Sequence, residues 1–441
     1  MLKKAIIGLS IISAVILADF TAFAQDGAYI GFTPYSIFAI GDLQTHGSAY
    51  HKGMGGVGIA TRNEKYQNYL NPASVTARDT LSFMADMSLS GSNSIFSQGD
   101  MTTAKNLFNI SNIAISFPIY KSYASMMLGI QPYSSTGYEY SYILADPAIV
   151  GNTGNAVYSS IGNGSTYKAF TSAGVTFFKK LSLGLEGDFY FGNIAKSNSF
   201  TFAKSAYSTI YSGYDIVLKG ASAKLGLQYE QPLGKSYKLG FGATYSLNTN
   251  LSGDVEDYEY ASGSSQNDTI RYKVTDLGAM KDRICIPSEL GLGISLNHSD
   301  SWRAEIDYLR SDWTGSGMDV ADGFAVNGAS AFTTKESESF RAGFEIIPNR
   351  NDIRYYYKRC TYRVGAYYDK SYYAVDGNQV NDIGVTLGAS LPVFRLYNAL
   401  TFALAVGQRS SLAGDMIRER YMKFSIGFNF HDRWFQKYHY E

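Results

Sequence analysis

The sequence predicts an all-β protein, a transmembrane antiparallel β-barrel of about fourteen strands with an N-terminal plug (hatch) in its lumen. Three observations support this prediction. Apolar and polar residues alternate in run after run along the chain. Very short polar turns alternate with long segments rich in glycine, serine, asparagine and aspartate. A leader typical of exported proteins precedes everything else.

The leader, residues 1–24, has the features of a secretory signal peptide. Lys3 and Lys4 supply its positive charge, an apolar stretch from Ala5 to Ala18 follows, and Ala22-Phe23-Ala24 is a small-x-small cleavage site. The apolar stretch is short for a bilayer-spanning helix, and no longer one follows it. We therefore expect residues 1–24 to be removed and the mature chain to be exported.

The composition fits a barrel and gives no sign of a nucleic-acid partner. The 38 lysines and arginines balance the 38 aspartates and glutamates, so the formal net charge is zero. The 44 glycines suit crowded lumen positions, and the 36 tyrosines suit aromatic girdles at the two lipid–water boundaries. The two cysteines, Cys285 and Cys360, are too few for a disulfide framework, and we expect them not to be bonded to each other.

The run from Met422 to Phe430 illustrates the alternation. Because successive side chains of a strand point to opposite faces, one face collects the apolar residues and the other the polar ones. The apolar face consists of Met422, Phe424, Ile426, Phe428 and Phe430, and the other of Lys423, Ser425, Gly427 and Asn429. A charge facing lipid at mid-membrane costs roughly 2–4 kcal/mol. The polar face is therefore expected to line the lumen.

The same pattern gives the strand count. The candidate strands are 81–90, 110–118, 123–140, 167–178, 181–194, 214–231, 237–251, 286–296, 302–313, 340–347, 360–368, 381–393, 399–408 and 421–430. Short turns alternate with longer segments, such as 144–165, 252–283 and 315–338, which we expect to be outer loops. An even count returns both ends of the barrel, residues 81–430, to the periplasm, where residues 431–441 would form a tail.

Charged residues fall on the expected lumen face of many strands. These residues are Glu186, Asp188, Glu289, Glu305, Asp307, Arg341, Glu345, Arg363 and Lys423. We expect them to form ion pairs across the lumen. Acid pairs such as Glu305 and Asp307 could in isolation suggest acid–base chemistry, but no nucleophile motif accompanies them. The histidines lack metal-ligand spacing, so the sequence predicts no catalytic residue, cofactor or metal site.

Residues 25–80 lack sustained alternation and precede the first clear strand. Their apolar side chains, among them Tyr29, Phe32 and Phe38, need burial, which favours a plug inside the barrel over a disordered periplasmic tail. Glycines allow tight turns and close approach to the wall. Residues 53–58 also match the dinucleotide pattern G-x-G-x-x-G, but no strand precedes them in a βαβ unit.

Several short motifs in order resemble those of the FadL-like outer-membrane transporter superfamily, most of all its Bacteroidetes-type branch with PorV-like members. The motifs are PYSIFAIGDL at 34–43, GMGG at 53–56, NPAS at 71–74, YRVGAYY at 362–368, GQR at 407–409 and DRWF at 432–435. The resemblance implies a fourteen-stranded barrel with an N-terminal hatch, whose Asn-Pro-Ala motif corresponds to Asn71, Pro72 and Ala73. It also implies passage of hydrophobic compounds such as long-chain fatty acids, which leave sideways through the third strand's wall.

Pro132 interrupts the third candidate strand. Proline has no N–H for the ladder and is tolerated at edges, bulges or breaks in pairing. In a closed barrel it would open a local gap in the wall. The alternative is that Pro132 lies above the bilayer, where the strand continues into an outer loop.

Two functions follow for a barrel in the outer membrane of a Gram-negative bacterium, in contact with outer-membrane lipid. The first is passive uptake of a hydrophobic small molecule with lateral release through the wall. The alternative is a non-transport subunit of an outer-membrane secretion or biogenesis complex, which needs an outer-membrane protein partner. A barrel enzyme is a weaker third option. Uptake requires a continuous apolar path to the wall near Pro132, whereas a scaffold subunit requires a sealed lumen.

Overall fold

The computed structural model describes residues 29–78, 82–120, 123–144, 147–204, 206–262, 267–279, 283–299, 301–325, 332–393, 398–410 and 416–433. The expected signal peptide and most of the expected C-terminal tail lie outside these residues. Within the described ranges, no helix is both long and apolar enough to cross a membrane.

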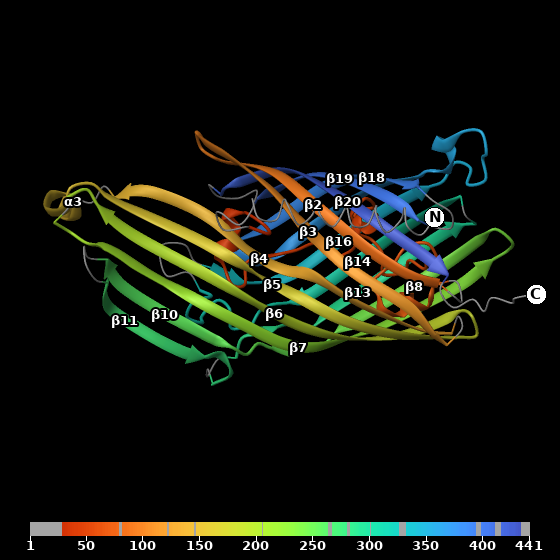
Figure 1. Cartoon of the computed structure of the whole chain (residues 1–441), viewed down its shortest axis with the longest axis horizontal. Helices are drawn as coiled ribbons and strands as arrows, with labels where there is room; N and C mark the ends of the chain where they lie inside the picture. The colour runs from red at the N-terminus through yellow and green to blue at the C-terminus, as the bar shows by residue number, and fades with distance from the viewer. Residues whose placement is uncertain are drawn as a thin grey trace, which may run out of the picture.

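Fourteen antiparallel strands form a closed barrel (Figure 1). They are β2 (Ser82–Gln98), β3 (Met101–Tyr120), β4 (Ala124–Leu144), β5 (Ala156–Phe177), β6 (Leu181–Phe202), β7 (Thr209–Leu233), β8 (Tyr237–Ser246), β13 (Glu289–His298), β14 (Trp302–Asp312), β16 (Glu336–Ile346), β17 (Thr361–Val375), β18 (Asn378–Pro392), β19 (Ala399–Ser410) and β20 (Arg418–Arg433). The first and last strands pair from Ser82–Arg433 to Ser97–Arg418 and so close the wall. The predicted antiparallel β-barrel of about fourteen strands is confirmed.

The two faces of the wall follow the predicted alternation. On β20, Met422, Phe424 and Phe428 are exposed on the outside, whereas Ser425 and Asn429 are buried inside. On β6, Leu183, Leu185 and Phe189 are exposed, and the acids between them are buried. The lumen, not a sheet–sheet interface, therefore receives the polar face.

The wall is taller on one side than the sequence predicts. Strands β4, β5, β6 and β7 run for 21 to 25 residues, whereas β8, β13, β14 and β16 have 10 or 11. The expected loop 144–165 is wrong, because β4 and β5 remain paired to Leu144–Ala156. The expected loop 252–283 is also wrong in part. It contains a hairpin of β10 (Asp254–Ser262) and β11 (Asn267–Asp276), which extends the wall beside β7 (Figure 1).

The remaining described elements are short. Residues 29–78, called here the N-terminal segment, contain η1 (Pro34–Ile37), β1 (Asp42–Leu43), α2 (Ala49–Lys52) and η2 (Pro72–Thr76). The connections contain α3 (Pro147–Thr153), β9 (Thr249–Asn250), η3 (Leu277–Ala279), β12 (Cys285–Ile286), β15 (Phe332–Thr334) and η4 (Tyr356–Arg359). Both cysteines are free thiols.

The end of the lumen that carries the long connections, called here the outer end, is filled by an apolar core. Phe38 and Ile40 of the N-terminal segment pack with buried residues of the outer connections, including Trp313 and Phe324. The backbone N–H of Ala39 donates to the carbonyl of Phe324 at 3.0 Å. The N-terminal segment and the connection after β14 are therefore one packed unit at this end.

Candidate functional site: the lumen and the wall at Pro132

The N-terminal segment is bound to β14 through two carboxylates predicted to face the lumen. Asp307 accepts hydrogen bonds from the backbone N–H of Gly58 at 2.7 Å and of Ile59 at 3.0 Å. Glu305 accepts from Ala60 N–H at 2.8 Å and from the hydroxyl of Thr61. These backbone groups lie in no sheet of their own, so the carboxylates satisfy donors that burial would otherwise leave unpaired.

The Asn71-Pro72-Ala73 motif lies where the N-terminal segment touches the wall. The Asn71 side chain accepts from Ala73 N–H at 3.0 Å, which caps η2, and donates to the carbonyls of Ile59 at 2.8 Å and Leu227 at 3.1 Å. The wall approaches so closely that a Cβ at Gly184 would lie 2.3 Å from the nitrogen of Ala73. The motif therefore ties the N-terminal segment to itself and to β7.

A second network joins arginines, acids and tyrosines near the turn end of the barrel. Arg363 forms an ion pair with Glu345 at 2.8 Å, and its guanidinium lies 4.0 Å from the centre of the Tyr50 ring. Arg303 donates to the Tyr50 hydroxyl at 3.1 Å. Tyr50 belongs to α2, so this network fixes the helix against β14, β16 and β17.

Burial in this network keeps a histidine neutral. Burial lowers the pKa of His51, next to Tyr50 in α2, to about 3, and the nearby Arg363 and Arg303 add to the effect. Its Nδ1 accepts from the backbone N–H of Ser48 at 3.3 Å. His51 thus serves as a neutral cap of its own short helix, not as a titrating group at physiological pH.

The other predicted lumen charges lie in separate groups around the wall. Lys168 on β5 forms ion pairs with Glu186 at 3.0 Å and Asp188 at 3.1 Å. Arg341 pairs with Asp369 at 3.2 Å. Glu289 has no ion pair among the described residues and lines a lumen cavity.

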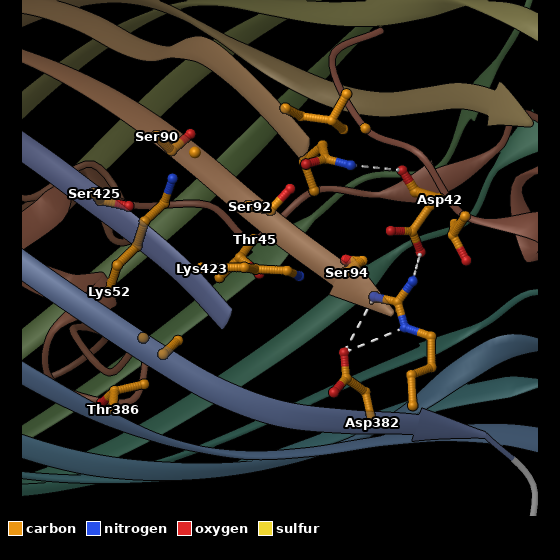
Figure 2. Close-up of a pocket in the computed structure, with 18 of the residues that line it drawn as sticks. Asp42, Thr45, Lys52, Ser90, Ser92, Ser94, Asp382, Thr386, Lys423 and Ser425 are labelled. Atoms are coloured by element: carbon orange, nitrogen blue, oxygen red, sulfur yellow. Dashed lines mark hydrogen bonds and ion pairs between the residues drawn. The ribbon is translucent and has the colours of Figure 1, made fainter. Parts of the chain in front are cut away.

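Two cavities between the N-terminal segment and the wall have volumes of about 130 and 160 Å³, and both have charged as well as apolar lining residues. Both are lined by Asp42, Arg341, Asp369, Asp382 and Arg409. In the first, Asp42 and Asp382 are joined through the guanidinium of Arg409 at 3.0 and 3.1 Å (Figure 2). Charged and hydroxyl groups of this kind hold water or ions and disfavour an apolar ligand.

Lys423 lies in the first cavity together with Lys52 of α2 (Figure 2). Lys423 lies 4.3 Å from the centre of the Tyr421 ring. Burial, and after it the charge of Lys423, lowers the pKa of Lys52 to about 8. Serine and threonine side chains surround the two ammonium groups (Figure 2).

The wall between β3 and β4 is paired over only part of its height. The pairing runs from Tyr120–Ala124 to Ile113–Ile130, and within the described chain residues 101–112 and 131–144 are not paired with each other. Pro132 lies just beyond the last pair, and the register of β4 against β5 shifts between Pro132 and Ser134. The missing N–H of proline is consistent with a ladder that ends here.

The N-terminal segment occupies this opening. The side-chain amide of Asn109 on β3 donates to the carbonyls of Tyr29 at 3.0 Å and Ile30 at 2.8 Å. Thr33 N–H donates to the carbonyl of Gly137 on β4 at 2.9 Å. β1 pairs with β4 at Ser134 and Ser135. The segment therefore bridges the two strands where their backbones do not pair with each other.

Several charged residues of the lumen were not among those predicted to line it. Arg409, which pairs with three carboxylates, lies one position beyond the end of the expected strand 399–408. Lys168 lies in the expected strand 167–178 on the same face as Phe170, and a charge and a large apolar residue on one face masked the alternation there. Asp42 belongs to the N-terminal segment, whose residues carry no periodic signal.

The family model of BamG matches residues 1–441. The chain belongs to the BamG family. No curated protein matches the chain.

The fold is that of FadL-like outer-membrane barrels. The toluene transporter TbuX of Ralstonia pickettii is 15% identical with a TM-score of 0.55, covering 87% of this chain and 98% of its own. A FadL homologue of Pseudomonas aeruginosa is 11% identical with a TM-score of 0.55, covering 92% and 100%. The monoaromatic hydrocarbon channel CymD is 15% identical with a TM-score of 0.55, covering 90% and 98%. The PorV-like branch stays a prediction.

Proposed function

We propose that this BamG family barrel is a closed subunit of an outer-membrane protein assembly, in which the N-terminal segment acts as a fixed plug. The observation that supports the proposal is the anchoring of residues 58–61 by Glu305 and Asp307. Moving the segment would expose two buried carboxylates and four donors in the same step. Hydrogen bonds to charged groups contribute about 1.5–3 kcal/mol each, so the closed state is strongly favoured.

The chemistry of the lumen supports a closed barrel over a channel for apolar solutes. The outer end is packed with apolar side chains that contact one another, among them Phe38 stacked on Phe332 at 4.8 Å. Both cavities next to the N-terminal segment contain the charged side chains of Arg341, Asp382 and Arg409 in their lining. A hydrophobic molecule would have to disrupt the core and then desolvate ions. This cost supports a closed barrel.

Two measurements test the proposal. The full-length protein, purified from its own membranes in mild detergent, is expected to retain a stoichiometric protein partner. In a planar bilayer it is expected to show almost no conductance, whereas a Glu305→Ala/Asp307→Ala variant, with its plug loosened, conducts. A barrel that retains apolar molecules without a protein partner, and conducts as well as this variant, would contradict the proposal.

A second function, uptake of a hydrophobic small molecule with lateral release, is favoured by the unpaired stretch between β3 and β4. Structures of similar fold are described as toluene transporters and a monoaromatic hydrocarbon channel. Lys105 and Glu139 form an ion pair at 3.8 Å across the opening. A bifunctional maleimide with a cleavable spacer, linking the two thiols of a Lys105→Cys/Glu139→Cys variant, would close it. Uptake of a labelled fatty acid or toluene that stops on cross-linking and returns when the spacer is cleaved would establish this function. Unchanged uptake would exclude this route.

A further inference from the structure

The connection between β16 and β17 differs from the other turns at its end of the barrel. It spans residues 347–360, whereas the turns 178–180, 234–236 and 299–301 have three residues each. Short turns mark the periplasmic end of an outer-membrane barrel. In Figure 1 this connection, drawn in light blue, stands off the wall at the end opposite α3. Residues 347–360 are called here the periplasmic hairpin.

The tip of the periplasmic hairpin is ordered by its own hydrogen bonds. The Asp352 carboxylate accepts from the backbone N–H of Arg354 at 2.9 Å and of Tyr355 at 2.7 Å, and forms an ion pair with Lys358 at 3.4 Å. The two arms are linked by Asn349 N–H, which donates to the carbonyl of Lys358 at 2.8 Å. A surface held in one conformation loses little entropy when a partner binds.

The base of the hairpin is fixed to the barrel by tyrosine hydroxyls. Tyr356 donates to the carbonyl of Pro392, at the end of β18, at 2.8 Å. Tyr362 on β17 donates to the carbonyl of Tyr357 at 3.0 Å. The tip therefore has a set position relative to the barrel wall.

Apolar and aromatic side chains on this ordered hairpin remain uncovered. Ile353 at the tip is 98% exposed, and Tyr357 and Tyr356 are 57% and 46% exposed. Single exposed apolar residues are common, but a cluster on a rigid protrusion is typical of an interaction site. A fully exposed isoleucine on such a tip can act as an anchor that fills a pocket of a partner.

The charge of the hairpin defines the partner further. The hairpin has four basic residues and one acid. The basic residues are Arg350, Arg354, Lys358 and Arg359. The acid, Asp352, binds the backbone N–H of Arg354 and the ammonium of Lys358 within the turn. Arg354 lies 5.0 Å from the ring centre of Tyr355, and Arg359 lies 5.1 Å from that of Tyr356. Tyrosine and arginine are enriched in protein interfaces, and a basic surface selects an acidic one.

The reach of the hairpin favours a protein over lipid headgroups. The last lipid-facing pair on these strands is Ile346 with Tyr362, both exposed. Ile347 N–H still donates to the carbonyl of Ser301 in the neighbouring turn at 2.7 Å, so the hairpin leaves the wall only after this residue, and Ile353 at its tip contacts little of the barrel. The headgroup layer on each side of a bilayer is only roughly 5–7 Å thick.

We propose that the periplasmic hairpin is the docking site for a periplasmic protein domain whose acidic surface surrounds an apolar pocket for Ile353. This inference rests on the proposed function, because it supplies a contact for the assembly. To the proposed function it adds that the partner binds on the periplasmic side, that the partner surface is acidic, and that Ile353 lies at the centre of the contact.

A photo-crosslinking amino acid at position 353 of the full-length protein, in living cells, tests the proposal. We expect one discrete protein adduct, identified by mass spectrometry as a protein with an acidic periplasmic domain. The same probe at Lys235, in the turn between β7 and β8, is the matched control and gives no such adduct. Lipid adducts alone, or no adduct, would overturn the proposal.

Charge reversal separates docking from mere proximity. An Arg354→Glu/Arg359→Glu variant is expected to lower the adduct yield about tenfold, whereas Lys235→Glu leaves it unchanged. Ile353→Ser, which removes the exposed apolar side chain without adding a charge, is expected to reduce co-purification of the same protein similarly. The heat-dependent gel shift of the folded barrel verifies that each variant folds. A yield insensitive to charge reversal refutes the docking site. If the assembly still co-purifies in that case, the proposed function stands without it.

Discussion

The barrel has a tall side, strands β4–β7, and a short side, strands β8, β13, β14 and β16, and different factors determine the strand length on each side. The strands β8, β13, β14 and β16 have 10 or 11 residues, close to the 9–11 that cross a bilayer. The strands β4–β7 have 21 to 25, so roughly half of each stands beyond the lipid. The short side is shaped by the membrane, whereas the excess of the tall side is supported by the apolar core at the outer end.

The N-terminal segment contacts both sides, but through different interactions. Against the short side, residues 58–61 are held by the carboxylates of β14. Against the tall side, Phe38 and Ile40 are held by apolar packing. Variants that weaken one attachment at a time therefore measure how much each kind of interaction contributes to holding the N-terminal segment in place.

The largest effect is expected from removing the charged attachment. The Glu305→Ala/Asp307→Ala variant leaves four donors without their acceptors and is expected to lose about 3–6 kcal/mol of unfolding free energy. Urea unfolding in detergent micelles measures the loss. The Glu305→Gln/Asp307→Asn variant keeps the shape of the side chains and part of their capacity to accept hydrogen bonds. Its free energy of unfolding is therefore expected to lie between those of the alanine variant and the parent. Equal stability of all three proteins would show that the carboxylates do not hold the segment.

The apolar attachment is expected to contribute slightly less. Phe324 is completely buried, so Phe324→Ala leaves a cavity and is expected to cost about 3–4 kcal/mol. Proteolysis of the outer connections, followed over time, is expected to accelerate. Val320 in the same connection is 66% exposed, so Val320→Ala is the matched control and changes neither quantity. Similar results for the two variants would argue against a packed core here.

A smaller effect is expected at Lys196, which joins the tall wall to the segment. Its ammonium donates to the carbonyls of Ile37 at 2.9 Å, Ala39 at 3.3 Å and Gly323 at 2.9 Å. Lys196→Met leaves these acceptors unpaired and is expected to cost about 2 kcal/mol in unfolding free energy. Lys180→Met, at an exposed turn, is the control. An unchanged urea midpoint for Lys196→Met would exclude the attachment.

The last expected effect is a pH dependence at Lys52, which appears only above about pH 8. Its pKa is lowered to about 8 in the folded protein, against 10.5 ordinarily, so the unfolded chain binds more protons between these values. Stability contributed by this group therefore rises as the pH increases from about 8 to 10.5 and is constant below. The difference in unfolding free energy between the parent and Lys52→Met, measured across this range, follows that rise. A difference that falls with pH would contradict the lowered pKa.

The sequence predicted the parts of the strands that lipid constrains. Where hydrocarbon faces the wall, alternate residues must be apolar, as at Leu183 and Leu185 on β6, and the period of two is visible. Beyond the bilayer this requirement ends. The sequence around Ser159 on β5 and the charged sequence of β11 were therefore interpreted as loops, although these backbones are paired in the sheet.

For each contact in the lumen, the sequence predicted the side chain on the wall but not its partner in the N-terminal segment. The alternation placed Glu305 and Asp307 inside, but their partners are backbone N–H groups of residues 58–60, which have no signature in the sequence. The interruption at Pro132 was visible, whereas its occupation by residues 29–33 depends on contacts with Asn109 and Gly137 that no local pattern encodes.

The position of the N-terminal segment has a consequence for the order of biogenesis. The hydroxyl of Thr33 donates to Glu419 across a separation of 386 residues, and Gly55 N–H donates to Thr386 across 331. The strands that complete these contacts leave the ribosome last, and pairing of β20 with β2 then encircles what lies within. Thr33 and Gly55 therefore cannot complete these contacts until the last strands have been synthesised. Because contacts of such long sequence separation form slowly, we expect the N-terminal segment to dock late in the folding of the barrel.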